Sequence, residues 1–221
     1  MMAELGNYAL ALSLAVSILL AIFPLLGAEK NIVSFMRLAR PMTYGLFVSL
    51  TISFGTLFYL FAVNDFSVQY VVNNSNSNLP LHYRLSAVWG SHEGSLLLWI
   101  WLLTFWSAAV AIFSKHLPQE AVARVLGIMG LISVGFLIFV LFTSNPFSRT
   151  FPNFPVDGKE LNPMLQDVGL IFHPPLLYLG YVGFSVAFAF ALASLMSGKL
   201  DSAWARWSRP WTMAAWVFLT L

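Results

Sequence analysis

Five apolar stretches without a charged residue or a histidine dominate the sequence and are separated by more polar segments. They are Leu5–Leu26, Met42–Val63, Ser95–Phe113, Val125–Phe142 and Pro174–Ser197. Each is close to the ~20 residues that an α-helix needs to cross about 30 Å of hydrocarbon. Only helices and closed barrels satisfy their backbone hydrogen bonds in a bilayer, and continuous apolar runs of this length are typical of helices. We therefore expect an all-α, multi-pass transmembrane helix bundle.

Composition supports an integral membrane protein rather than a soluble domain with one anchor. Only 9% of the 221 residues are charged, and the mean hydropathy is +0.78, whereas about 25% of residues are charged in soluble domains. The net charge of +2 is too small to indicate a nucleic-acid partner. The absence of cysteine excludes disulfides, thiolate metal sites and a CxxC redox motif on this chain.

The two ends of the sequence give separate expectations. No Lys or Arg precedes Lys30, so the first apolar run lacks the basic region of a cleavable signal peptide and is expected to span the membrane. After Pro210 the chain is apolar again, but 211–221 is only about half a crossing. We expect a truncated sixth span here, which would make residues 1–221 the N-terminal membrane portion of a longer protein.

The basic residues alternate between the segments that join the apolar runs. The segments after the first, third and fifth runs hold eight of the eleven Lys and Arg, and those after the second and fourth hold Arg84, Arg149 and Lys159. The positive-inside rule therefore predicts an N-terminus outside the cytoplasm and two long external segments, 64–94 and 143–173. Long connections commonly carry function, so we expect the chemistry to face outward.

His173 lies in the most distinctive segment, Gly169–Tyr178. Pro174 and Pro175 suit the first turn of a helix, which would place His173 at the outer mouth of the fifth span. A neutral imidazole there could bind a metal. A histidine that only hydrogen-bonds a loop carbonyl is the alternative, and position alone favours that alternative somewhat.

The segment Trp89–Trp99 contains the adjacent pair His92 and Glu93 between two glycines that permit a tight turn. This pair could cap the third span, coordinate a metal or relay a proton. Spacing alone favours a helix cap made by Ser91 or Glu93, because a single His-Glu pair is weak as a metal motif.

The aromatic residues of this region and of the C-terminal link fit a membrane interface. For the tryptophans at 89, 99, 101 and 106 we favour an aromatic belt or lipid-facing positions over a flat surface for an aromatic macrocycle. Trp204, Arg206, Trp207 and Arg209 are expected to anchor the cytoplasmic interface. The five runs contain no ionisable residue, which argues against a proton or ion pump.

Three segments resemble one family: Trp89–Trp99, Phe142–Arg149 and Leu161–Tyr178 are similar to the CcmF family, the haem lyase subunits of bacterial cytochrome c maturation. The resemblance extends from Met1 to Leu221, and the related subunit of the nitrite reductase pathway shares many of these motifs. It implies a multi-pass protein of the bacterial inner membrane. Such proteins receive haem from a periplasmic chaperone and join it to the CxxCH cysteines of apocytochrome c, whose thiols a partner subunit keeps reduced.

The resemblance also implies residue roles. His173 matches the first of two periplasmic histidines that hold the iron of the substrate haem, a b-type haem before attachment. The second periplasmic histidine, a tryptophan-rich segment and the ligands of a separate haem b are expected beyond Leu221, so this portion alone should be inactive. Trp89 and His92 are further candidates for cofactor binding at the same end.

Two other classes of function stay open from the sequence. One is a membrane transport subunit that moves haem or protons, for which buried charges or paired broken helices would be the signal. The other is an assembly subunit without a cofactor. The haem content of a protein lacking His173 would distinguish them from a haem lyase.

Overall fold

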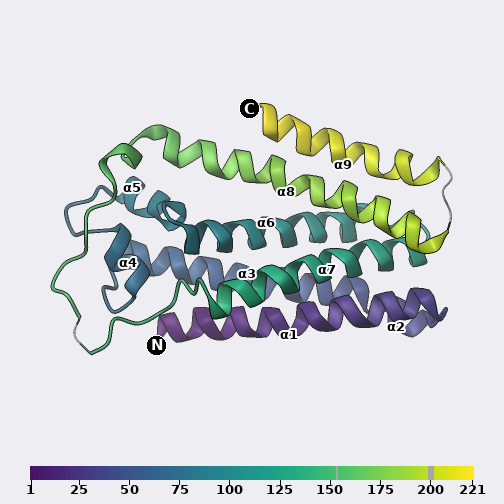
Figure 1. The fold of residues 1–221 in the computed structure, drawn as a ribbon, viewed down its shortest axis with the longest axis horizontal. Coiled ribbons are helices and arrows are strands. Elements are labelled where there is room, and N and C mark those ends of the chain that lie inside the picture. The colour runs from purple at the N-terminus through teal and green to yellow at the C-terminus, as the bar shows by residue number, and fades with distance from the viewer. Residues whose placement is uncertain (153, 199–201) are drawn as a thin grey trace.

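The computed structural model describes residues 1–152, 154–198 and 202–221. Its long helices run nearly parallel or antiparallel along one long axis (Figure 1). The long helices are α1 Met2–Glu29, α3 Ala39–Ala62, α6 His92–Phe113, α7 Gln119–Phe142, α8 Val168–Ser197 and α9 Ala203–Thr220. The short ones are α2 Val33–Arg37, α4 Gln69–Asn74, α5 Leu81–Ser86 and the 3₁₀ turns η1 Ala87–Trp89 and η2 Pro163–Leu165. In the described part of the chain, five helical segments are long and apolar enough to cross a membrane. The predicted all-α bundle is confirmed.

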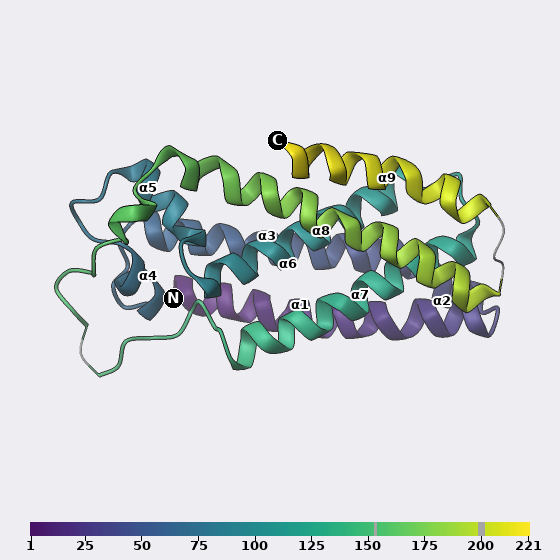
Figure 2. The ribbon, with the colours of Figure 1, turned by 45° about the horizontal axis from the view of Figure 1, so that its top comes forward.

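The bundle is built around α6, which packs against α3, α7 and α8, while α1 packs against α3 and α7. The turned view shows α9 lying along α8 on one side of the molecule (Figure 2). Leucines such as Leu10, Leu50 and Leu103 are completely buried between the helices. Small polar residues join α1 to α3: the hydroxyls of Ser13 and Ser49 lie 2.7 Å apart. Such contacts are common where membrane helices approach closely.

The two long segments predicted to lie on one side of the membrane meet at the end of the bundle that holds the N-terminus (Figure 1). The amide of Gln69 donates to the carbonyl of Ser148 at 2.8 Å, and the amide of Thr150 donates to the carbonyl of Ser67 at 3.1 Å. The guanidinium of Arg149 also binds the carboxylate of Glu4. These contacts join residues 64–94 to residues 143–152 and 154–167 in one layer over this end of the bundle.

The start of α8 differs from the prediction. The carboxylate of Asp167 accepts a 2.7 Å hydrogen bond from the amide of Gly169, so the helix begins at Val168, before the expected Pro174. Asp is a favourable N-cap because its oxygen satisfies an otherwise unpaired amide. The placement of Pro174 and Pro175 in the first turn is therefore wrong: both are interior helix residues.

Two other helix limits change the account of the opposite end. α7 begins at Gln119, before the apolar run 125–142, and so includes Arg124, a charged residue that is only 5% exposed. α9 begins at Ala203, ahead of Pro210, so Trp204 to Arg209 form helix rather than a link. Lys199, which was counted in that link, lies outside the described residues.

Candidate functional site

His173 lies on α8 roughly one and a half turns from its N-cap. It is exposed, and its imidazole has no hydrogen-bonding partner among the described residues. Large apolar side chains close to it in sequence are exposed as well, with Phe172 at 62% and Val168 at 60%. The imidazole is therefore accessible on a helix that also exposes apolar side chains. The alternative in which His173 bonds a loop carbonyl is wrong for this structure.

Trp89 reaches this part of α8 directly. Its indole Nε1–H donates to the carbonyl oxygen of Leu170 at 2.8 Å. In a regular α-helix this carbonyl would accept from the amide of residue 174, but that residue is proline and has no N–H. The indole thus supplies the donor that Pro174 lacks, one turn before His173.

The turn that carries Trp89 is held in place by Tyr70, a residue that the sequence analysis did not identify. Tyr70 of α4 is 3% exposed, and its hydroxyl donates to the carbonyl of Val88 at 2.9 Å. The amide of Ser91 donates back to the same hydroxyl at 3.3 Å. Burial raises the pKa of Tyr70 above its ordinary value, so the phenol stays protonated and keeps this donor role.

The pair His92 and Glu93 begins α6 beside this turn. His92 is exposed, and its Nδ1 lies 3.3 Å from Oε2 of Glu93, an oxygen that is buried. Ser91 occupies the N-cap position as predicted, but its side chain makes no capping hydrogen bond, and the expected side-chain cap is wrong. Glu93 instead places a negative charge in the first turn, where the helix dipole favours it.

Two tryptophans of α6 connect this helix to its neighbours. Trp106 is 5% exposed, and its indole donates to the carbonyl of Leu179 on α8 at 3.0 Å. Trp101 donates to the hydroxyl of Thr51 on α3 at 3.0 Å. A lipid-facing position is therefore wrong for Trp106, whose ring also meets Trp211 and Phe218 of α9.

The geometry defines what this end of the molecule can bind. Within the described ranges, no three His, Cys, Asp or Glu side chains form a cluster able to hold a metal ion. The structure brings Trp89 to the α8 turn before His173, whereas His82, also exposed, lies on α5 at the same end, and His116 lies at the opposite end. This end therefore presents exposed imidazoles but no preformed metal cluster among the described residues.

Comparison with known proteins gives a consistent result. The model of the family described as "Cytochrome C assembly protein" matches residues 89–221, beginning at Trp89 itself. CcmF of Haemophilus influenzae, a cytochrome c-type biogenesis protein, is 85% identical over all 221 residues, which are 34% of its length. CcmF of Escherichia coli is 60% identical over the same span, again 34% of its length.

A solved structure of a "Cytochrome c Heme Lyase CcmF" superposes on the whole chain with a TM-score of 0.86 and 32% identity, covering 34% of that structure. The chain thus spans about a third of the length of the relatives it matches. The resemblance inferred from the three motifs is confirmed, and the chain belongs to the cytochrome c assembly protein family.

Proposed function

We propose that this chain is the N-terminal membrane part of a haem lyase, and that His173 is one axial ligand of the haem it handles. The observation that carries the proposal is the accessible, unpartnered imidazole of His173 on a helix turn fixed by Trp89. A haem ligand must be neutral, free on one nitrogen and held in orientation. The relatives named for cytochrome c biogenesis and haem lyase activity match over this entire region.

The residues around His173 fit a haem. The exposed Phe172 and Val168 offer an apolar surface for the macrocycle. In this proposal His173 is the one axial ligand from this chain, and the second comes from another part of the complete protein. Trp89 acts in this account by positioning α8. His92, at the start of α6, is kept as a candidate for a further contact.

The chemistry assigned to the complete protein is thioether formation. The S–H of each CxxCH cysteine adds across a vinyl C=C of haem, so that one S–C and one C–H bond form without a net oxidant. Addition requires reduced thiols and a haem held in a fixed orientation. A chain without cysteine offers no competing thiol.

The location and partners follow from the same proposal. We infer that the end of the bundle carrying His173 faces the periplasm of the bacterial inner membrane, because eight of eleven basic residues lie in the segments assigned to the other side. The partners are then a periplasmic haem chaperone, apocytochrome c and its thiol-reducing subunit. A separate, structural haem b belongs to the part of the protein beyond this chain.

A cytochrome c yield assay tests the ligand role. Replacement His173→Ala in the complete protein should reduce the yield of haem-stained cytochrome c by roughly tenfold or more, and external imidazole should restore part of it. His82→Ala is the matched control, because His82 is an exposed histidine at the same end. An unchanged yield in His173→Ala, with normal protein levels, would contradict the proposal.

A further inference from the structure

The start of α8, Val168–His173, is joined to the rest of the helix by fewer hydrogen bonds than a regular helix provides. In a regular helix each carbonyl accepts from the amide four residues later. Pro174 and Pro175 lie inside α8 and lack an N–H. The carbonyls of Leu170 and Ile171 therefore have no amide partner of this kind. We call Val168–His173 the His173 turn, and the two prolines weaken its connection to the body of the helix.

The His173 turn is also lightly packed against the bundle. Val168 is 60% exposed and Phe172 is 62% exposed, and Gly169 and His173 are exposed as well. Within the turn, which lies wholly in the described part of the chain, Leu170 alone is buried, at 8% exposed. Few buried apolar contacts are typical of segments that open locally.

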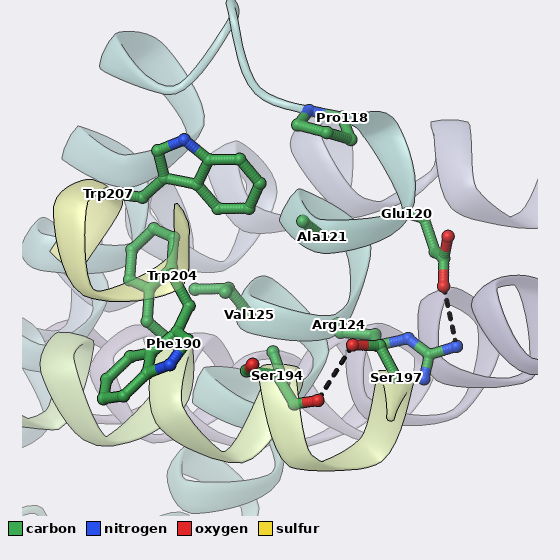
Figure 3. A pocket seen from close by; sticks show the side chains of 11 residues that line it. Pro118, Glu120, Ala121, Arg124, Val125, Phe190, Ser194, Ser197, Trp204 and Trp207 are labelled. Atoms are coloured by element: carbon green, nitrogen blue, oxygen red, sulfur yellow. Dashed lines mark hydrogen bonds and ion pairs between the residues drawn. The ribbon is translucent and has the colours of Figure 1, made fainter. Parts of the chain in front are cut away.

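The body of α8, by contrast, is held by its neighbours along its length. Val182 and Val186 are completely buried, and the indole of Trp106 on α6 donates to the carbonyl of Leu179 at 3.0 Å. Near the far end, Phe190 is 2% exposed and lies beside a pocket lined by residues of α7, α8 and α9 (Figure 3). A movement of the whole helix would disrupt this packing, whereas a movement of the turn alone would not.

Trp89 provides the contact that holds the His173 turn in its observed position. Its Nε1–H donates to the carbonyl of Leu170 at 2.8 Å, and no side chain of the described residues donates to the carbonyl of Ile171. The bond joins the turn to the segment before α6 rather than to the body of α8. It can therefore break without unwinding the rest of the helix.

We propose that the His173 turn is a hinged segment that pivots at Pro174 and Pro175, and that the hydrogen bond from Trp89 latches it in the position seen here. Pivoting changes the position of the His173 imidazole while the body of α8 stays in place. The consequence for haem rests on the proposed function. A ligand that receives a haem and later releases it is suited to a segment with a low free energy of opening.

Hydrogen–deuterium exchange of the complete protein, purified without substrate haem, tests the hinge. Amides of residues 168–173 should exchange roughly tenfold or more faster than those of residues 178–186. Trp89→Phe removes the latch and should raise exchange in the turn roughly five- to tenfold, with the body of α8 unchanged. Trp101→Phe is the matched control, because it removes an indole donor that binds Thr51 on α3 instead of α8. It should leave exchange in the turn unchanged.

Replacement of both prolines tests the pivot. Pro174→Ala with Pro175→Ala supplies the two missing amides and should slow exchange in the turn. Equal exchange rates in the turn and the body of the wild type would overturn the proposal. An unchanged turn in Trp89→Phe, or a turn and body that accelerate together, would overturn it as well. If the double proline variant does not fold, Trp89→Phe still decides the result.

Addition of haem distinguishes the hinge from the proposed function. Haem should slow exchange in the His173 turn of the wild type, and it should have no effect on the turn in His173→Ala. If the Trp89 and proline variants behave as expected while haem leaves the wild type unchanged, the hinge is supported and the role of His173 as an iron ligand is contradicted.

Discussion

The indole of Trp89 donates to the carbonyl oxygen of Leu170 at 2.8 Å, in the place of the amide that Pro174 cannot provide. This relationship joins the two most distinctive sequence segments of the protein. It fixes the first turn of α8 to the turn before α6, and it lies one helical turn from His173. A carbonyl freed by a proline is thus satisfied by a side chain from 81 residues earlier in the chain.

A double-mutant cycle tests this substitution of donors. Trp89→Phe keeps an aromatic ring but loses the N–H, and should reduce the free energy of unfolding by about 1 kcal/mol. In a Pro174→Ala background, residue 174 has an N–H that can donate to the carbonyl of Leu170. Trp89→Phe should then reduce the free energy of unfolding by clearly less. Hydrogen exchange of the amides at the start of α8 reports the effect. Equal costs in both backgrounds would show that the two residues are not coupled.

Gly94→Ala should disturb the turn beneath Trp89. A Cβ at Gly94 would lie 1.7 Å from the carbonyl oxygen of Val88 and 2.6 Å from the hydroxyl of Tyr70. We expect a loss of about 2–3 kcal/mol in unfolding free energy, seen as a lower thermal midpoint. Gly135→Ala is the control, because nothing lies within 4 Å of its added Cβ. That replacement should be neutral or slightly stabilising.

Gly180 allows α9 to lie against α8. An added Cβ would lie 2.5 Å from the backbone nitrogen of Leu219, so Gly180→Val should separate the two helices. The indole of Trp106 contacts both helices, so its fluorescence spectrum should change when they separate. An unchanged spectrum and thermal midpoint in Gly180→Val would contradict the close packing described for this crossing.

The contact between the two long segments should depend on pH. The carboxylate of Asp157 accepts hydrogen bonds from the hydroxyl and amide of Ser77 and from the amide of Gly158, which hold its pKa below its usual value of 3.8. Because the folded pKa is the lower one, the stabilisation is present above the unfolded pKa and is lost as pH falls through the folded pKa. Amide exchange at Ser77, referred to the intrinsic rate at each pH, should rise in acid below about pH 4. In Asp157→Asn this pH dependence should disappear.

Cysteine labelling tests the membrane orientation that is inferred from the basic residues. The chain contains no cysteine, so single cysteines can be introduced without background from this region. In a complete protein free of other cysteines, Ser77→Cys should react with a membrane-impermeant maleimide added to the periplasm, whereas His116→Cys should react only after lysis. The reverse result would place the His173 end in the cytoplasm and remove the basis of the proposed reaction.

The number and type of the spanning helices follow from the sequence alone, because apolar length and the lack of charge are local properties of each run. The start of α8 could not be predicted from the sequence, because Pro174 and Pro175 dominate the local pattern and indicate a helix that begins with them. They are tolerated inside the helix because Asp167 starts it earlier and Trp89 supplies one missing donor. Both compensations depend on a neighbour, and the second is visible only in three dimensions.

Contacts with residues distant in the sequence also explain why the roles of Arg124 and Tyr70 were not predicted. Arg124 looks like a loop cation by its position between apolar runs, but Glu120 on the same helix and the carbonyl of Ala28 on α1 make its burial tolerable. Tyr70 lies in a polar segment with no motif, yet its hydroxyl joins α4 to the Trp89 turn. His173 became a candidate because its neighbours are unusual in the sequence itself, with two prolines directly following it.

Haem content of the purified complete protein is the most direct test of His173 as an iron ligand. Pyridine haemochrome quantitation should show that His173→Ala loses about one haem equivalent per protein relative to the wild type, while His82→Ala retains it. Any separate haem b should persist in both variants. Equal haem content and an identical absorption spectrum in His173→Ala and the wild type would contradict the assignment of His173.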